Sequence, residues 1–262
     1  MTTDILQTIM AHKRRLTAAR RVALPEARLE ALAAAQPPAR SLAAALRRAR
    51  PAAIIAEFKR RSPSCGWISR GARVEPVVAQ YASGGAAALS ILTDEAYFGG
   101  TPADLQAARA ATGLPILCKD FILSPYQLLE ARAAGADAVL LIAAALSRPT
   151  CRRLAQKARE LGMEVLLELH DAREADYLEI SPDMVGVNNR HLGSLHTDSR
   201  HALQLIGLLP EGLVRVAESG IRTPAELRRL QQAGYDAFLI GTALMRSAAP
   251  QALLRQLIQP AP

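Results

Sequence analysis

Eight short aliphatic runs, spread over residues 52–262, constrain the fold of this chain more than any other feature of its sequence. They are the segments IIAEFK, AALSIL, PILCK, AVLLI, EVLLEL, MVGVN, VRVAE and AFLI, which begin at positions 54, 87, 115, 138, 164, 184, 214 and 237. The aliphatic part of each run is continuous rather than alternating, as expected for parallel strands that are buried on both faces. The pattern therefore predicts eight parallel strands.

The stretches between these runs carry helix signals. A capping residue followed by proline at the first helical position occurs three times, at Thr101, Ser124 and Thr223. Glycines stand where these helices should end, at positions 113, 135 and 234. Eight strand–helix units predict an α/β fold of the (β/α)8 barrel type. The alternative, an open doubly wound sheet, is disfavoured because no GxGxxG follows the first run.

Residues 1–50 show a helical pattern and no strand pattern. The first helix is indicated by an apolar stripe at helical spacing, formed by Ile5, Leu6, Ile9 and Met10. Pro25 begins a second helix, and Ser41 can cap a third. We expect one barrel domain over residues 1–262, with residues 1–50 as a helical N-terminal extension.

Composition narrows the class of partner. The formal charge is +8, yet only four of the 32 basic residues are lysines, and neither lysine runs nor interleaved aromatics appear. This disfavours nucleic-acid binding and indicates attraction of an anionic small molecule. The three cysteines form no CxxC or zinc pattern, and no apolar stretch is long enough to span a bilayer. We expect a cytoplasmic protein that binds no metal and no membrane.

Polar residues gather where the predicted strands end. These residues are Glu57, Lys59, Lys119, Asp120, Glu168, His170, Asn188, Asn189, Arg190, Glu218, Ser219, Gly220, Gly241 and Thr242. A satisfied polar residue at a barrel rim can explain any one of them. It does not readily explain them all, because the active sites of such barrels lie at the carboxyl ends of the strands.

Two glycine-containing pairs indicate a phosphate site. Ser219-Gly220 and Gly241-Thr242 follow the last two strands, where backbone N–H groups and a short helix can receive an anion. The alternative is that both glycines only form turns. Lys59 could reach either the phosphate or the reacting centre.

A second set of residues can bind the rest of the substrate. An apolar slot for an aromatic ring can be formed by Phe98, Phe121, Leu140, Leu192 and Ile240. Ordinary packing under loops is the alternative for each of them. Ser62 lies in a loop after the first strand that is rich in hydrogen-bonding groups.

Together these residues resemble the indole-3-glycerol phosphate synthase family. The matching stretches cover nearly the whole chain and include AEFKRRSPSCG, LSILTDEAYFGG, CKDFILSPYQ, LLELH, GVNNRHL, ESGIRTP and LIGTALMR. The resemblance implies closure of the indole ring of 1-(2-carboxyphenylamino)-1-deoxyribulose 5-phosphate, with loss of carbon dioxide and water, in tryptophan biosynthesis. It also implies a monomer without cofactors, whose N-terminal extension covers the barrel mouth, the rim formed by the carboxyl ends of the strands.

The resemblance also implies site residues. Lys119 would be the general acid and Glu168 its acidic partner, with Lys59, Glu57 and Asn188 completing the catalytic set. Arg190 would contact substrate, and the two glycine-containing pairs would hold phosphate. Whether Lys59 or Lys119 is the acid of the dehydration step, and whether Glu168 or Glu57 is its base, stays open.

The chain departs from the family pattern at several positions. They are Phe58, Cys65, Cys118, His191 and Thr242, and the segment between Asp171 and Met184 is short, so the helix expected there should be clipped. The same residues are also compatible with two other functions. One is another phosphate-binding barrel enzyme, such as an isomerase or a Schiff-base aldolase that uses Lys119, and the other is a catalytically silent scaffold.

Overall fold

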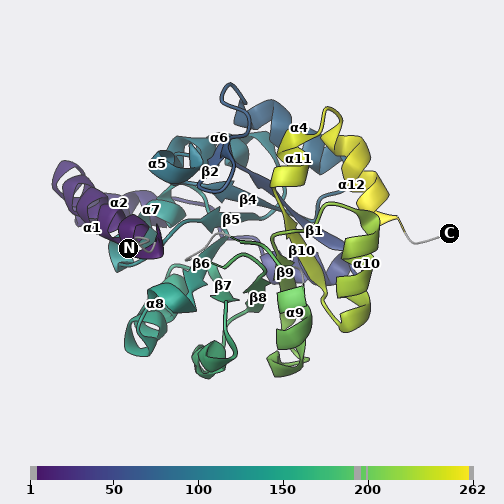
Figure 1. The fold of residues 1–262 in the computed structure, drawn as a ribbon. Coiled ribbons are helices and arrows are strands. Elements are labelled where there is room, and N and C mark those ends of the chain that lie inside the picture. Colours follow the sequence, from purple (N-terminus) through teal and green to yellow (C-terminus); the bar gives the residue numbers. More distant parts are fainter. Residues whose placement is uncertain (1–4, 192–195, 199, 260–262) are drawn as a thin grey trace.

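The computed structural model describes residues 5–191, 196–198 and 200–259. Its eight parallel strands close into a barrel in the order β1-β10-β9-β8-β7-β6-β5-β4, with helices around it (Figure 1). The strands are β1 (Ala53–Phe58), β4 (Ala88–Leu92), β5 (Ile116–Lys119), β6 (Ala138–Ile142), β7 (Glu164–Leu169), β8 (Met184–Asn188), β9 (Val214–Glu218) and β10 (Ala237–Ile240). Each contains one of the aliphatic runs, so the predicted (β/α)8 barrel is confirmed.

The barrel strands are buried on both faces. Every residue of β1, β4, β6, β8 and β10 is buried, because one face points into the barrel and the other lies under helices. This two-sided burial is why the strands are continuously aliphatic. A separate antiparallel hairpin, β2 (Arg61–Ser62) with β3 (Gly66–Trp67), forms in the loop after β1.

Helices of unequal length connect the strands. The longer ones are α4 (Val74–Ser83), α6 (Pro102–Ala111), α7 (Pro125–Ala133), α8 (Arg148–Glu160), α10 (Pro224–Ala233) and α12 (Pro250–Ile258). The shorter ones are α5 (Glu95–Phe98), α9 (Arg200–Leu205), α11 (Thr242–Arg246) and the 3-10 helices η1 (Ala143–Ala145), η2 (Ala172–Ile180) and η3 (Ile206–Leu208). The predicted clipped segment is η2, a 3-10 helix in place of an α-helix.

Two of the three predicted caps form as the sequence indicates. Thr101 and Thr223 each make a capping box, with Asp104 and Glu226 respectively. Ser124 begins α7 but makes no side-chain cap, so this prediction was wrong. Nearby polar groups are bonded by Gln127 instead, which accepts from the Leu123 N–H and donates to the Phe121 carbonyl.

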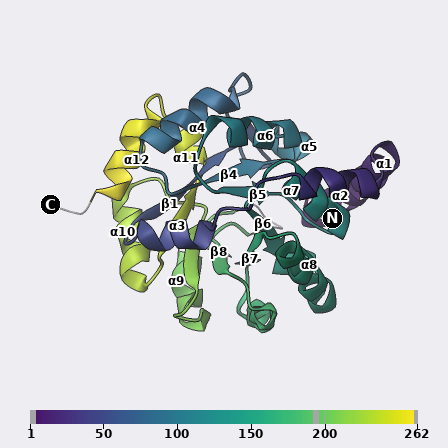
Figure 2. The ribbon, with the colours of Figure 1, turned by 180° about the vertical axis from the view of Figure 1, so that it is seen from behind.

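The N-terminal extension consists of three helices with different neighbours. α1 (Ile5–Ala23) buries the side chains of Leu6, Ile9, Met10 and Lys13. α2 (Glu26–Ala34) packs on α7. α3 (Leu42–Arg48) contacts β1, β4 and β9 and lies across the barrel when it is seen from behind (Figure 2). The amino end of α3 is fixed at the start of β7, because the Ser41 hydroxyl and the Ala43 N–H both donate to Glu164.

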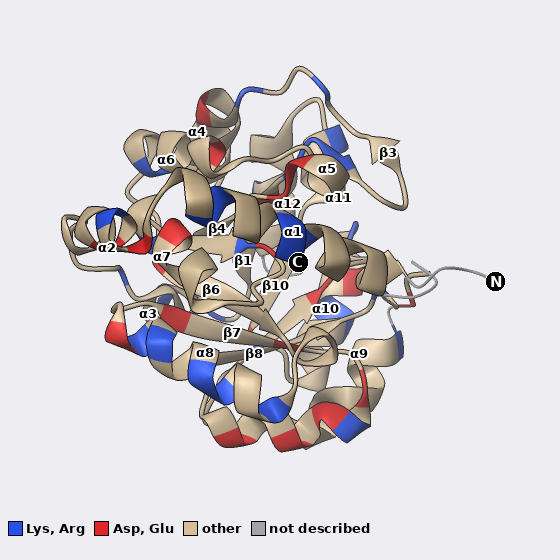
Figure 3. Ribbon diagram, turned by 90° about the vertical axis from the view of Figure 1, so that its left-hand side faces the viewer, with Lys and Arg blue, Asp and Glu red and all other residues tan. Residues whose placement is uncertain are grey.

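Charged residues are dispersed over the outside of the barrel. Figure 3 shows blue and red segments interspersed over the surrounding helices. Surface ion pairs link several of them, such as Arg152 with Glu179 at 2.9 Å and Arg148 with Asp176 at 3.0 Å. Within the described ranges, no helix has the length and apolar character needed to cross a membrane.

The capping difference predicts a difference in stability. Thr223→Ala should lower the free energy of unfolding by about 1 kcal/mol, because it removes the acceptor for the Glu226 N–H. Ser124→Ala is the matched control at another proline-started helix, and it should change the free energy by less than about 0.5 kcal/mol. Urea denaturation measures both, and an equal loss in the two variants would contradict the assignment of the caps.

Candidate active site

A cavity of about 380 Å³ opens at the carboxyl ends of the strands. Its lining includes the sequence-predicted residues Glu57, Lys59, Ser62, Phe98, Lys119, Phe121, Leu140, Glu168, Asn188, Arg190, Ser219, Gly220, Ile240, Gly241 and Thr242. Leu192, the remaining one, lies outside the described residues. Residues that are far apart in the sequence meet here because parallel strands present their carboxyl ends at one rim.

Lys119, the last residue of β5, is the central cation of the cavity. Its Nζ lies 3.0 Å from Oε2 of Glu168 and 3.7 Å from Oε2 of Glu218. Burial alone would lower the pKa of Lys119, but the charges of Glu168, Glu218 and Glu57 outweigh burial and raise that pKa above its usual value. The ammonium form is therefore retained inside the protein, where it can donate a proton.

The two glutamates beside Lys119 are in opposite protonation states. Burial would raise the pKa of Glu168, but the ammonium of Lys119 outweighs burial and lowers it to about 2. Burial and the charge of Glu168 raise the pKa of Glu218 well above its usual value. Like charges in one buried site cannot both ionise at low cost, so the two shifts favour an ionised Glu168 beside a neutral Glu218.

His170 contacts the carboxylate oxygen of Glu168 that does not face Lys119. Its Nε2 lies 3.3 Å from Oε1 of Glu168, and the side chain is largely buried. Burial lowers the pKa of His170, against the pull of the Glu168 carboxylate, so the ring is neutral at neutral pH. The charge of Glu168 is thus compensated mainly by Lys119.

Glu57 and Lys59 form a second ion pair at the end of β1. The Lys59 Nζ lies 2.5 Å from Oε1 of Glu57, and both side chains line the cavity. A Cβ at Gly241 would lie only 2.2 Å from the same oxygen, and one at Gly186 only 2.3 Å from Oε1 of Glu218. These glycines therefore make room for carboxylates, a requirement that the sequence did not reveal for either position.

The two loops predicted to hold phosphate both reach the cavity. Ser219 and Gly220 turn back with positive φ values of 66° and 79°, and Gly241 immediately precedes α11. The Ser219 conformation is unfavourable for a residue with a Cβ. It is supported by Asn189, whose Nδ2 donates to the Ser219 carbonyl at 3.0 Å. Asn189 thus shapes the loop, although the sequence analysis gave it no role.

One wall of the cavity is apolar. The rings of Phe98 and Phe121 lie 6.3 Å apart between centroids, in a tilted arrangement. The α1 helix adds three more apolar side chains to the lining, those of Ile5, Leu6 and Ile9. An aromatic ring fits against such a surface while charged groups remain on the other walls.

Several lining residues were not selected from the sequence. Glu218 was noted only as a strand end, and Arg222 and Arg246 were not considered. The useful signal for Arg246 was its position one turn after Thr242, at the end of the short helix α11. For Glu218, the signal was the same strand-end position that identified Glu168.

The fold and the cavity define the chain as a (β/α)8-barrel protein with a charged pocket at the carboxyl ends of its strands. Residues 6–257 match the family model described as indole-3-glycerol phosphate synthase. The chain therefore belongs to the indole-3-glycerol phosphate synthase family.

Relatives of that name align along nearly their full length. The chain is 46% identical to indole-3-glycerol phosphate synthase of Bacteroides thetaiotaomicron, and the alignment covers 98% of each chain. It is also 46% identical to indole-3-glycerol phosphate synthase 2 of Streptomyces coelicolor, over 97% of this chain and 98% of the relative.

More distant solved structures share the barrel alone. A thiamine phosphate pyrophosphorylase from Pyrococcus furiosus superposes with a TM-score of 0.60 at 16% identity, over 81% of this chain and 95% of its own. A 3-hexulose-6-phosphate synthase superposes with a TM-score of 0.64 at 14% identity, over 79% and 98% respectively.

The opposite pKa shifts predict opposite pH behaviour in two glutamine variants. The stabilising effect of a raised pKa is present below the unfolded value and is lost as pH rises through the folded value. Wild-type protein should therefore lose stability relative to Glu218→Gln as pH rises above 5.

Glu168→Gln is the comparison. Because the pKa of Glu168 is about 2, its contribution is complete above the usual value of 4.5 and is lost only as pH falls toward 2. Wild-type protein should thus lose stability relative to Glu168→Gln as pH falls from 4.5 toward 2. Urea denaturation at several pH values measures both differences in the free energy of unfolding. A Glu218→Gln variant that becomes less stable relative to wild type as pH rises would contradict the neutral state of Glu218.

Proposed function

We propose that this chain catalyses the reaction of its family, closure of the indole ring in tryptophan biosynthesis. The substrate would be 1-(2-carboxyphenylamino)-1-deoxyribulose 5-phosphate, and the products indole-3-glycerol phosphate, carbon dioxide and water. The observation that carries the proposal is Lys119, a largely buried ammonium held beside the Glu168 carboxylate on the wall of a cavity that is apolar on one side.

Ring closure requires a proton donor at the ketone. In the proposed step an aromatic carbon attacks the ketone carbon, and Lys119 gives a proton to the developing alkoxide. The attack leaves a positive charge on the ring nitrogen. The Glu168 carboxylate stabilises that charge from a fixed position, where little water competes with it.

Decarboxylation and dehydration complete the reaction. Loss of carbon dioxide returns an electron pair to the ring, and departure of the hydroxyl as water needs one acid and one base. Two largely buried ammonium–carboxylate pairs are available, Lys119 with Glu168 and Lys59 with Glu57. We propose that these pairs share the remaining proton transfers.

The other lining residues would hold the substrate. We assign the phosphate to Ser219, Gly220, Gly241 and Thr242, and the aromatic ring to the wall that contains Phe98, Phe121, Leu140 and Ile240. Arg190 and Ser62 are suited to the carboxylate and hydroxyl groups between these ends. Asn188 supports Arg190, because its Oδ1 accepts from the Arg190 N–H at 3.0 Å.

A Schiff-base aldolase is a poorer fit. A nucleophilic lysine must be neutral when it attacks, so aldolases depend on a lowered lysine pKa. The glutamates around Lys119 raise its pKa instead. The cavity is therefore better suited to proton donation by Lys119 than to covalent attack.

We further propose that the protein works as a cytoplasmic monomer. In the described part of the chain, the large exposed apolar residues are scattered, as Val22, Leu32, Trp67 and Leu208. A large apolar interface would require a contiguous patch. Sedimentation equilibrium measures the mass directly.

The direct test is incubation of the purified protein with the proposed substrate. Appearance of indole-3-glycerol phosphate, followed by ultraviolet absorbance and mass spectrometry, would support the proposed function. Substrate that stays unchanged in the presence of correctly folded protein would refute it.

Lys119→Met should lower turnover by about 10²–10⁴-fold, the usual contribution of a positioned proton donor. Substrate affinity should change much less, because Lys119 is assigned to the reacting centre. Lys157→Met, which removes a lysine from the outside of α8, is the control and should retain wild-type turnover. A Lys119→Met enzyme with more than half of wild-type turnover would contradict the assignment of Lys119 as the general acid.

Inorganic phosphate should compete with substrate for the loops after β9 and β10. Backbone N–H groups there, and the start of α11, provide donors for an anion. Initial rates at several phosphate concentrations test for competition. A phosphate-soaked crystal should show the anion against Gly220 and Gly241, and an anion elsewhere with these loops empty would contradict the assignment.

We also propose that α1 covers the substrate. Exclusion of water by such a cover strengthens the charge interactions in the site. Ile9→Ala should therefore weaken substrate binding and lower turnover together, each roughly threefold or more, as is usual for defects in a closing element. Normal kinetic constants in this variant would mean that α1 has only a structural role.

A further inference from the structure

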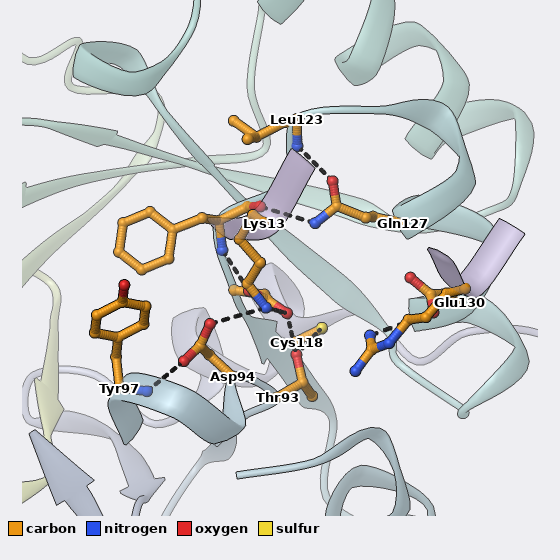
Figure 4. Close-up of polar contacts among 11 residues, drawn as sticks. Lys13, Thr93, Asp94, Tyr97, Cys118, Leu123, Gln127 and Glu130 are labelled. Atoms are coloured by element: carbon orange, nitrogen blue, oxygen red, sulfur yellow. Dashed lines mark hydrogen bonds and ion pairs between the residues drawn. The ribbon is translucent and has the colours of Figure 1, made fainter. Parts of the chain in front are cut away.

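A lysine of the N-terminal extension is buried next to the proposed general acid. Lys13 extends from α1, and only 1% of the residue is exposed. Figure 4 shows its ammonium group between the ends of two barrel strands. Its Nζ lies 2.6 Å from Oδ1 of Asp120 and 3.1 Å from Oδ2 of Asp94.

Asp120 directly follows Lys119 and makes four polar contacts. Lys13 lies within reach of both carboxylate oxygens, at 2.6 Å and 2.9 Å. Asp120 Oδ1 also accepts from the Phe121 N–H, and Oδ2 accepts from the Thr93 hydroxyl, each at 2.7 Å. Asp120 therefore fixes the backbone of its chain neighbour Phe121 and joins the end of β5, directly after Lys119, to Lys13 and Thr93.

Asp94 connects Lys13 to the end of the neighbouring strand, β4. Its Oδ1 accepts from the Tyr97 N–H at 2.7 Å and so caps α5, which ends at Phe98. The Thr93 N–H donates to the Lys119 carbonyl at 3.3 Å, which joins the two strand ends directly. Lys13 thus contacts the segments that carry the proposed acid and both rings of the apolar wall.

The burial of this cation is not needed to attach α1. The helix already buries Leu6, Ile9 and Met10, and Arg20 makes a partly buried ion pair with Glu130 of α7 at 3.3 Å. A buried ammonium is costly unless carboxylates surround it. Burial lowers the pKa of Lys13, but Asp120 and Asp94 outweigh burial and raise it above its usual value, so the lysine is charged.

We propose that Lys13 is a positioning residue for the reaction, acting through Asp120 to hold the end of β5 with Lys119 directed into the cavity. This inference rests on the proposed function, because it concerns the same general acid. Misplacing a catalytic group by about 1 Å can cost 10²-fold in rate, so loss of Lys13 should affect mainly the chemical step.

The first test compares Lys13→Met with Arg20→Met, which removes the other ion pair between α1 and the barrel. In Lys13→Met, kcat should fall about tenfold or more, while KM stays within about threefold of wild type. Arg20→Met should leave both constants within about twofold. A wild-type kcat in folded Lys13→Met would overturn the proposal, and so would equal losses in the two variants.

The second test is a double-mutant cycle, which also covers failure of Lys13→Met to fold. Asp120→Asn should lower kcat by itself, and adding Lys13→Met should change it by less than about twofold, because the contact is already lost. The double variant removes one cation and one anion, so it leaves the net charge of the cluster unchanged. A further tenfold fall in the double variant would show that Lys13 does not act through Asp120, and would overturn the proposal.

Hydrogen exchange provides a readout that does not depend on activity. The Phe121 and Tyr97 amides donate to the two carboxylates that Lys13 holds. Peptides containing them should exchange faster in Lys13→Met or in the double variant than in Arg20→Met. Unchanged exchange would contradict the proposed positioning, whereas an inactive wild type with the expected exchange pattern would count against the proposed function alone.

Discussion

The active site depends on a balance of charges buried at one end of an aliphatic barrel. Lys119 lies between Glu168 and Glu218, and Lys59 is paired with Glu57 at the end of β1, which only β4 separates from β5. Charges removed from water are costly unless opposite charges lie close to them. The balance is reached because Glu168 ionises, Glu218 stays neutral and both lysines have a carboxylate within contact distance.

This balance also explains local features of the barrel. Gly186 lies in the middle of β8, where a side chain would be expected, because Oε1 of Glu218 takes up that space. Gly241 has the same relation to Glu57. A glycine in a buried strand loses side-chain packing, and here that loss accommodates a carboxylate at the barrel mouth.

Much of the fold could be predicted from the sequence, because each strand of a parallel barrel is a continuous aliphatic run. The cavity residues at the strand ends could largely be predicted as well, because active sites in such barrels lie at the carboxyl ends of the strands, whereas Arg222 and Arg246 could not. Lys13 could not be identified in this way. A lysine within an amphipathic helix is typical of a solvent-exposed position, and its partner Asp120 lies 107 residues further along the chain. The failed cap at Ser124 has a similar cause, since the contacts of Gln127 are set by the β5–α7 loop.

Known proteins that share only the fold of this chain differ from those that also share its family. Barrels at 14–16% identity share the architecture with this chain, whereas relatives at 46% identity share the family as well. A barrel alone does not determine chemistry. We propose that in this chain the chemistry is carried by the strand-end charges and supported by the helical extension, whose first helix lines the cavity and contributes the buried Lys13.

The protonation state of Glu218 tests this account most directly. Carbon-13 NMR of protein labelled at the glutamate carboxyl carbons, with Glu218→Gln to assign the signal, reports that state across a pH titration. The account predicts a Glu218 signal typical of a neutral acid well above pH 4.5, while the Glu168 signal stays that of a carboxylate. A Glu218 carboxyl that is fully ionised at pH 5 would contradict it.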